Sequence, residues 1–167
     1  MEKEITEVYC GNGRGKTTLA IGQALRASSQ GKSVIIIQFL KRNERRELDF
    51  LEELDQLDIK IFRFEKMESC YDQLNEEEQV EEERNILNGL NFARKVIATQ
   101  ECDFLVLDEI LGLLDKHIAT VDMVVGLLKQ KDESMHLILT GNRVDPGILD
   151  YVDSVTTITT LGREQNS

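Results

Sequence analysis

A glycine-rich segment near the start of the chain constrains the fold more than any other part of the sequence. It separates an apolar run at residues 5–10, which predicts a strand, from residues 16–29, where alanines recur at helical spacing. The segment reads Gly11, Asn12, Gly13, Arg14, Gly15, Lys16, Thr17 and Thr18. A strand, a glycine-rich turn and a helix in this order are typical of the first unit of a parallel α/β sheet.

The same segment carries the residue types that bind a chain of phosphates. Glycines permit the backbone angles that turn successive N–H groups inward at a helix N-terminus, where anions bind. Lys16 can reach the terminal phosphates, and the Thr17 hydroxyl can ligate Mg²⁺. The general pattern places a glycine at position 10, where this chain has Cys10. We expect residues 11–18 to grip the triphosphate of ATP with Mg²⁺, and the flanking strand and helix argue against a chance match.

Short apolar runs alternate with longer amphipathic runs along the chain, as in repeated βαβ units. Strands are predicted at residues 5–10, 33–39, 59–64, 104–107, 137–139 and 155–158. Helices are predicted at residues 16–29, 44–54, 121–128 and 146–151, with a longer one after Asn75 and a loop at 65–75. No linker or change of composition divides residues 1–167. The sequence thus predicts a single-domain α/β protein with a P-loop NTPase-like fold, whose mostly parallel sheet of five or six strands has helices on both faces.

The longest predicted helix begins with an acidic stretch. Asn75 is a good N-cap, and the carboxylates of the first turn are favourably placed against the positive end of the helix. Residues 76–83 contain six glutamates, and Ile86, Leu90 and Ile97 then mark one apolar face. We interpret the acidic half as a solvated surface; the alternative is a site for a metal ion or a basic partner.

A second chemical element follows the apolar run at residues 104–107. Asp108 and Glu109 come directly after this run, and open parallel sheets bind ligands beyond the carboxyl ends of their strands. One carboxylate can hold Mg²⁺ directly or through water, while the other orients a water molecule or a substrate group. Because a phosphate loop precedes them in the chain, we expect these carboxylates to complete the metal site with Thr17.

Two other strand ends carry further candidates. Gln38 and Lys41 follow the second predicted strand, so they are expected at the same crevice as residues 11–18. Arg143 follows the strand at residues 137–139, and its guanidinium is suited to a bidentate phosphate contact. For each of these residues the alternative is a surface position on a turn.

Charge and cysteine content argue against several other classes of protein. The formal net charge is −11, and no Lys or Arg cluster is long enough to form the basic surface that nucleic acid or an anionic membrane requires. Cys10, Cys70 and Cys102 lack zinc-type spacing, and His117 and His136 stand alone, so three reduced thiols are expected. Without a signal peptide or an apolar run of about 20 residues, we expect a cytoplasmic protein with no membrane span.

Four stretches of the sequence resemble one known family. They are residues 8–18, 36–41, 104–109 and 139–141, which include the motifs Gly-Asn-Gly-x-Gly-Lys-Thr-Thr and Gln-Phe-x-Lys. On these motifs the chain resembles the P-loop corrinoid adenosyltransferases, which act on cob(I)alamin or cob(I)yrinic acid a,c-diamide, over nearly its whole length. The position of Cys10 is not normally glycine in that family, so the departure from the general pattern fits the resemblance.

The resemblance implies a reaction, its substrates and its partners. Members transfer the 5′-deoxyadenosyl group of ATP to the cobalt of a reduced corrinoid and release triphosphate. Cobalt(I) is the nucleophile, so the protein positions ATP and stabilises the leaving group. By this resemblance Lys16, Thr17 and Glu109 act in catalysis, and Thr17, Asp108 and Glu109 hold Mg²⁺. The implied substrate-binding positions are residues 11–18, Gln38, Lys41 and Arg143. A homodimer and a flavoprotein reductase that supplies cobalt(I) are implied as well.

Two other functions stay open on the sequence alone. A different P-loop enzyme, such as a small-molecule kinase or an ATPase, would need a catalytic base or a water-positioning residue, for which Glu109 is the obvious candidate. The second alternative is a catalytically weak or inactive relative that binds ATP or corrinoid. It is favoured by the lack of the tryptophan that family members carry before the long helix, where Phe64 and Tyr71 are the nearest aromatic residues, and by the lack of the family's basic tail.

Overall fold

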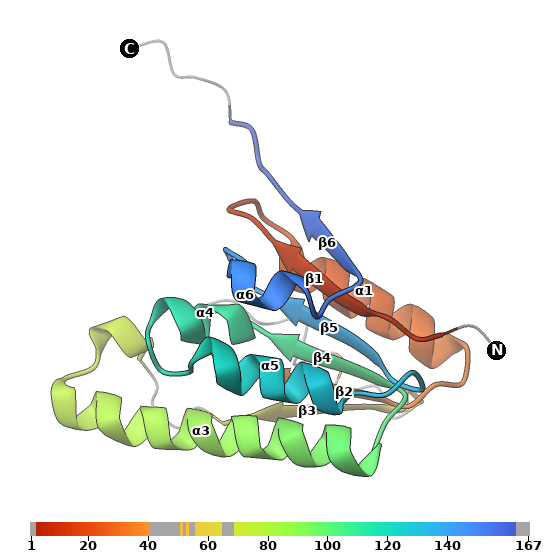
Figure 1. The fold of residues 1–167 in the computed structure, drawn as a ribbon, viewed down its shortest axis with the longest axis horizontal. Helices are drawn as coiled ribbons and strands as arrows, with labels where there is room; N and C mark the ends of the chain where they lie inside the picture. The colour runs from red at the N-terminus through yellow and green to blue at the C-terminus, as the bar shows by residue number, and fades with distance from the viewer. Residues whose placement is uncertain (1–2, 41–50, 52, 54–55, 65–68, 163–167) are drawn as a thin grey trace.

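The computed structural model describes residues 3–40, 51, 53, 56–64 and 69–162 of the chain (Figure 1). Lys41 and most of the predicted helix at residues 44–54 lie outside these residues. The described strands and helices alternate along most of the chain, as the sequence pattern predicts for βαβ units.

Six strands form one sheet in which each pairing between neighbours is parallel. The strands are β1 (Thr6–Cys10), β2 (Val34–Gln38), β3 (Ile59–Arg63), β4 (Phe104–Asp108), β5 (His136–Thr140) and β6 (Ser154–Thr157). Their order across the sheet is β3-β2-β4-β5-β1-β6, so β1 lies between the last two strands of the chain. The predicted parallel sheet is confirmed, and each predicted strand agrees with an observed one to within one residue at either end.

Helices cover both faces of the sheet (Figure 1). They are α1 (Lys16–Ser29), α3 (Glu76–Thr99), α4 (Ile110–Asp115), α5 (Val121–Gln130) and α6 (Pro146–Leu149), with a 3-10 turn η1 (Tyr71–Gln73). On one face α1 packs closely through its small buried residues Ala20, Ala24 and Ala27. The other face is covered by α3, α4, α5 and α6. The prediction of helices on both faces is therefore confirmed.

Strand β2 shows why this sheet needs cover on both faces. Its five residues, Val-Ile-Ile-Ile-Gln, are all buried. Ile35 and Ile37 belong to the core under α3 and α5, whereas Val34 and Ile36 belong to the core under α1. Successive strand residues point to opposite faces, and burial of each aliphatic side chain contributes about 1.5–3 kcal/mol. An unbroken apolar strand is thus stable only between two layers of helices.

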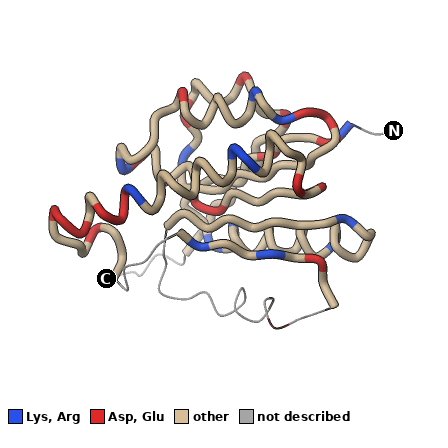
Figure 2. Tube along the Cα trace, turned by 90° about the horizontal axis from the view of Figure 1, so that it is seen from below, with Lys and Arg blue, Asp and Glu red and all other residues tan. Residues whose placement is uncertain are grey.

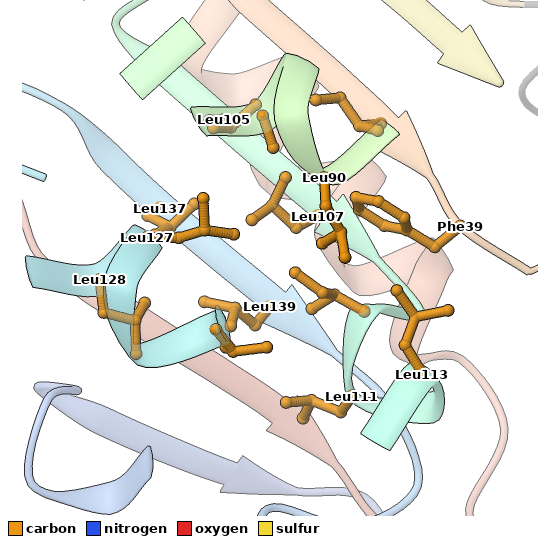
Figure 3. Close-up of a cluster of buried hydrophobic side chains, with 14 of the residues drawn as sticks. Phe39, Leu90, Leu105, Leu107, Leu111, Leu113, Leu127, Leu128, Leu137 and Leu139 are labelled. Atoms are coloured by element: carbon orange, nitrogen blue, oxygen red, sulfur yellow. The ribbon is translucent and has the colours of Figure 1, made fainter. Parts of the chain in front are cut away.

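The larger of the two core clusters extends to the carboxyl end of the sheet (Figure 3). Leu107 of β4 and Leu139 of β5 lie there with Phe39 and Leu111. Leu111 packs so tightly beyond β5 that a Cβ on Gly141 would lie 2.4 Å from the Leu111 Cβ atom. This packing fixes α4 against the end of the sheet, and it also fixes Glu109, the residue that precedes α4.

Helix α4 is absent from the predicted elements. It spans only six residues, and Gly112 interrupts its apolar run, so no helical period can be recognised there. Its stability comes from burial, since Ile110, Leu111 and Leu113 are each 0% exposed. A helix of fewer than two turns depends on such tertiary packing, because helix nucleation in isolation is unfavourable.

The predicted N-cap of α3 is confirmed. The Asn75 side chain accepts a hydrogen bond from Glu78 N at 2.9 Å, and Asn75 N donates to Glu78 Oε2 at 3.1 Å. This reciprocal capping box satisfies backbone donors that the helix itself leaves without an acceptor. Just before it, η1 adds one turn to the stretch predicted as a loop, whose residues 65–68 lie outside the described part of the chain.

The three cysteines are free thiols, as predicted, and Cys10 and Cys102 are buried. Burial raises the pKa of Cys102 to about 12, so this thiol stays protonated and inert at neutral pH. None of the helices described here is both long enough and apolar enough to pass through a bilayer.

Candidate functional site

Polar groups from four neighbouring strands meet at the carboxyl edge of the sheet. The glycine-rich loop follows β1, Gln38 ends β2, Asp108 ends β4 and Thr140 ends β5. Gln38 and Asp108 are direct partners in the register of β2 and β4. The predicted convergence of strand ends is therefore present, at the edge where open parallel sheets bind ligands.

The loop between β1 and α1 takes a backbone path that only glycine can follow. Gly11 has a φ of 110°, and a Cβ on it would lie 2.3 Å from Ile158 O. A Cβ on Gly13 would lie 2.6 Å from the same oxygen. Gly15, with a φ of 100°, then forms the N-cap of α1. The glycines thus bring the chain out of β1 and directly into a helix N-terminus, where backbone N–H groups can bind an anion.

The Lys16 ammonium lies inside this loop. Its Nζ atom donates to Gly11 O at 2.6 Å, to Gly13 O at 3.1 Å and to Asn142 Oδ1 at 3.3 Å. The residue is 4% exposed, which is low for a lysine. Several acceptors therefore hold one positive charge at the turn, beside the N-terminus of α1. Asn142, which was not among the predicted site residues, reaches this point because it follows the end of β5.

Asp108 is the centre of a buried hydrogen-bond network. Its Oδ1 atom accepts from the Thr17 hydroxyl at 2.9 Å and from the Thr140 hydroxyl at 2.8 Å, and its Oδ2 atom accepts from Gln38 Nε2 at 3.3 Å. Asp108 is 2% exposed. The donors come from α1, β5 and β2, so the carboxylate is fixed in one orientation. The expected meeting of Thr17 with the carboxylate after β4 is thereby observed.

Glu109 adopts an unusual backbone conformation at the start of α4. Its φ of 62° lies in the left-handed region, which costs a residue with a side chain about 1–3 kcal/mol. Its N–H donates to the Thr140 hydroxyl at 2.8 Å, which holds the turn in place. Such backbone strain clusters at ligand sites, so it marks Glu109 as a functional candidate independently of the sequence motif.

A cavity of about 410 Å³ opens beside Glu109. Its volume is in the range of small-molecule sites. Among the residues that line it are Leu40, Tyr71, Glu82, Glu109, Lys116 and Asn142. Because Asn142 also contacts Lys16, the cavity adjoins the glycine-rich loop. A phosphate chain bound by the loop and a second ligand bound in the cavity would therefore lie next to each other.

Nearly the whole sequence matches one known family. The family model described as ATP:corrinoid adenosyltransferase BtuR/CobO/CobP matches residues 2–165, which include the glycine-rich loop, Asp108 and Glu109. The chain belongs to this family. The resemblance that the motifs at residues 8–18 and 104–109 suggest is thereby confirmed.

Relatives of this adenosyltransferase family match most of the chain. The corrinoid adenosyltransferase of Escherichia coli (strain K12) is 29% identical over 160 residues, covering 93% of this chain and 76% of the relative. Corrinoid adenosyltransferase CobA of Salmonella typhimurium (strain LT2) is 27% identical over 158 residues, with the same coverage of both chains. A KaiC-like protein of Pyrococcus horikoshii OT3 matches with a TM-score of 0.60 at 19% identity, covering 97% of this chain and 76% of that one. This last likeness supports the predicted P-loop NTPase-like fold.

In this member of the adenosyltransferase family, one wall of the cavity is held by contacts between η1, α3 and the end of α4. The Tyr71 hydroxyl donates to Glu83 Oε1 at 2.5 Å. Lys116 Nζ bonds the Asp72 carboxylate at 2.6 Å and lies 5.8 Å from the centre of the Tyr71 ring. Burial, and then the hydrogen bond to Glu83, raises the pKa of Tyr71 to about 12. Tyr71 is thus a neutral donor that stays anchored at neutral pH.

The acidic half of α3 divides into two parts. Glu76, Glu77 and Glu81 are exposed, and Figure 2 shows the acidic residues gathered at this end of the molecule. Glu82, in contrast, is 3% exposed, accepts a hydrogen bond from Asn85 Nδ2 at 3.3 Å and lines the cavity. The interpretation of this stretch as a solvated surface is therefore wrong for Glu82. The helix turns the Glu82 side chain away from solvent, whereas Glu81, one position before it, is exposed.

Several other predicted site residues among those described make no contact with phosphate-binding groups that the structure shows. Arg143 is exposed, and its guanidinium donates to Asp115 Oδ1 at 2.9 Å beside a second cavity of about 310 Å³. Within the predicted segment at residues 11–18, Asn12 and Thr18 are exposed. Lys41 lies outside the described residues. The contact of Arg143 with phosphate therefore stays a prediction, and among described residues near the strand end it is Asn142 that reaches Lys16.

A segment after β6 packs along the glycine-rich loop. Gly13 N donates to Ile158 O at 2.9 Å, and Ile158 N donates to Cys10 O at 2.8 Å. Arg14 N donates to Thr160 Oγ1 at 2.9 Å. No feature of the sequence predicts these contacts, because they depend on β6 pairing with β1 in one register. The path of the loop is therefore set in part by residues near the C-terminal end of the chain.

Proposed function

We propose that the chain transfers the 5′-deoxyadenosyl group of ATP to the cobalt of a reduced corrinoid and releases triphosphate. The observation that carries the proposal is the juxtaposition of Lys16 in the glycine-rich loop, the Thr17–Asp108 hydrogen bond and the adjoining cavity. Membership of the ATP:corrinoid adenosyltransferase family supports the same reaction.

The nucleotide half of the proposal rests on the loop and the start of α1. A triphosphate needs backbone N–H groups, a helix N-terminus and a cation within a few ångströms of each other. Gly15 and Lys16 supply the helix N-terminus, and the buried Lys16 ammonium supplies the cation. In a partly buried site this charge is screened less than it would be in water, so it stabilises the negative charge of the leaving triphosphate.

The residues present fit Mg²⁺. Thr17, Asp108 and Glu109 offer oxygen atoms, which Mg²⁺ prefers as ligands. Because the Thr17 hydroxyl donates its hydrogen to Asp108, its oxygen lone pairs are left to accept a cation. Within the described residues no group of three or more His, Cys, Asp or Glu side chains could hold a metal ion. Mg²⁺ is usually held by one or two carboxylates together with substrate phosphates. When bound, Mg²⁺ would supply positive charge to the phosphates.

The acceptor half of the proposal rests on the cavity. A corrinoid is a large planar macrocycle, so only part of it would enter a cavity of about 410 Å³, with the remainder outside. Apolar Leu40 and Ile86 line the cavity together with the anchored Tyr71, which offers contact area for an apolar ring face. Glu109 lines this cavity, and its N–H binds the same Thr140 hydroxyl that donates to Asp108, so it is placed to orient the substrates.

The reaction needs no nucleophile or base from the protein. The electron pair of cobalt(I), a substrate atom, forms the cobalt–carbon bond to C5′ while the C5′–oxygen bond breaks, and triphosphate leaves with the electron pair of that broken bond. The side chains contribute position and charge: Lys16 stabilises the leaving group, and Asp108 and Thr17 would hold Mg²⁺ beside it. The proposal also includes a homodimer, a cytoplasmic location and a flavoprotein reductase that supplies cobalt(I).

An anaerobic assay with ATP, Mg²⁺ and chemically reduced corrinoid tests the proposal. We expect the cobalt(I) absorbance to disappear while a light-sensitive adenosylcorrinoid and triphosphate form in equal amounts. A Lys16→Ala variant serves as the control, because it removes the loop cation. Release of ADP and phosphate would instead support a kinase or an ATPase, and ATP binding without any product would support a binding protein.

A further inference from the structure

A row of three polar side chains crosses the carboxyl edge of the sheet from β3 to β4. Arg63 Nε donates to Gln38 Oε1 at 2.8 Å, and Gln38 Nε2 donates to Asp108 Oδ2 at 3.3 Å. The sheet register produces this row, because Gln38 is the direct partner of Arg63 on one side and of Asp108 on the other. The last residue of each strand therefore contacts the last residue of the next.

The chemistry of the two neighbours fixes the orientation of the Gln38 amide. An arginine Nε–H can only donate a hydrogen bond, and a carboxylate can only accept one. The amide must therefore turn its oxygen toward Arg63 and its NH₂ group toward Asp108. With the opposite orientation, the amide oxygen would face the Asp108 carboxylate and the NH₂ group would face the guanidinium, so both contacts would be repulsive.

Burial makes this orientation matter. Gln38 is 1% exposed and Asp108 is 2% exposed, so water has little access to replace a lost contact. A buried polar atom without its partner is costly, and the surrounding groups rearrange to avoid it. Arg63, in contrast, is exposed at the edge of the sheet. Its hydrogen bond to Gln38 thus links a surface residue to the centre of the metal site.

We propose that Arg63 is a positioning residue for Mg²⁺–nucleotide binding, acting through Gln38 on the Asp108 carboxylate. The inference rests on the proposed function, since it assumes that Asp108 helps to hold Mg²⁺ with ATP. By locking the amide of Gln38, Arg63 keeps Asp108 Oδ2 in place while Thr17 and Thr140 hold Oδ1. Residues that orient metal-binding carboxylates in this way typically change metal affinity about 10- to 100-fold when they are replaced.

Nucleotide affinity measured with and without Mg²⁺ tests this role. Arg63→Met keeps an unbranched side chain out to the position of Nε but removes the donor, and we expect it to weaken binding of a fluorescent ATP analogue in Mg²⁺ about 3- to 10-fold. Binding of the same analogue in EDTA should be unchanged. Arg63→Lys, which keeps a donor at the end of a flexible side chain, should recover part of the Mg²⁺-dependent affinity. Lys60→Met, on the same strand and also exposed, is the matched control and should bind as the wild type does.

A double-mutant cycle tests whether the effect passes through Gln38. Gln38→Met removes the amide, and after this change Arg63→Met should have no further effect on Mg²⁺-dependent affinity. Equal weakening with Mg²⁺ and in EDTA would overturn the proposal, because it would indicate a direct contact of Arg63 with phosphate or a general loss of structure. Full additivity of the two substitutions would overturn it as well.

These outcomes are distinct from failure of the proposed function. If wild-type protein binds the ATP analogue in an Mg²⁺-dependent way and Arg63→Met binds equally well, only the role of Arg63 is refuted. If wild-type protein shows no Mg²⁺-dependent nucleotide binding, both the role of Arg63 and the proposed transfer reaction are refuted. Adenosyl transfer that fails while nucleotide binding follows the expected pattern would refute the transfer reaction alone.

Discussion

Replacement of Gly13 by alanine should damage both stability and nucleotide binding. The added Cβ would lie 2.6 Å from Ile158 O, 2.8 Å from Ile158 C and 2.9 Å from Ile158 Cγ2. Real Cβ atoms essentially never come within 3.0 Å of other heavy atoms, and the first two of these are backbone atoms that cannot simply rotate away. Either the glycine-rich loop or the segment at residues 158–160 must therefore move.

The expected cost has two parts. Overpacking of a close contact typically costs about 1–3 kcal/mol. Gly13 N also donates to Ile158 O at 2.9 Å, and loss of this hydrogen bond adds about 0.5–1.5 kcal/mol. For a protein of this size each kcal/mol lowers the melting temperature by about 2–4 °C, so we expect a decrease of about 3–18 °C. ATP affinity should fall as well, because the loop that holds Lys16 changes its path.

Gly22→Ala is the matched control for this substitution. Gly22 lies within α1, and a Cβ there would meet nothing within 4 Å. Alanine is the better helix former, so Gly22→Ala should stabilise the protein by about 0.5–1 kcal/mol and leave ATP binding unchanged. Thermal unfolding and calorimetric titration with Mg²⁺–ATP measure both effects. A Gly13→Ala protein with wild-type melting temperature and wild-type ATP affinity would refute the close packing of the loop on Ile158.

Three further predictions concern the loop and the opposite end of the sheet. Lys16→Ala should weaken triphosphate binding by about 1.5–3 kcal/mol, as measured by titration, and unchanged affinity would contradict the phosphate-loop assignment. Thr160→Val frees Arg14 N for phosphate and should tighten triphosphate binding about 2- to 10-fold, whereas Thr159→Val should not; equal affinities would count against the contact. The hydrogen bond from Lys32 lowers the pKa of Glu4 in the folded protein. The stability that the Glu4 carboxylate contributes is therefore fully present above its ordinary pKa of 4.5, and it is lost as the pH falls through the lowered pKa of the folded state. Glu4→Gln should therefore reduce the free energy of unfolding in urea at pH 7 but not at about pH 3, and equal losses at both values would contradict this linkage.

Local sequence patterns were sufficient to predict the strands and the core of the site. The β2 run of apolar residues is continuous because helices cover both its faces, so the burial is visible in the sequence itself. The positions of the glycine-rich loop and of Asp108 were predictable as well, since the loop directly follows β1 and Asp108 ends β4. In a parallel sheet these strand ends must meet at one edge.

Contacts that depend on register could not be predicted in this way. The Arg63–Gln38–Asp108 row requires β2 to lie between β3 and β4 with their last residues aligned, and no local pattern specifies that order. The packing of residues 158–160 on the loop depends likewise on the place of β6 beside β1.

Burial of single polar residues was also beyond the sequence. Glu82 lies among five other glutamates that share its composition, and only the rotation of α3 against the sheet distinguishes it from them. Helix α4 has too few residues to show a period, so its position, and with it the strained backbone of Glu109, comes from tertiary packing.

The formation of a bond between cobalt and the C5′ carbon of ATP is the central claim, and one labelling experiment tests it most directly. ATP carrying ¹³C at C5′ is incubated anaerobically with the protein, Mg²⁺ and reduced corrinoid, and the ¹³C NMR spectrum is recorded in the dark. We predict that the signal of the labelled C5′ carbon shifts from the position of a carbon bonded to phosphate oxygen to that of a carbon bonded to cobalt, in step with release of triphosphate. A label that stays on ATP, or that appears on ADP, would contradict the proposed reaction.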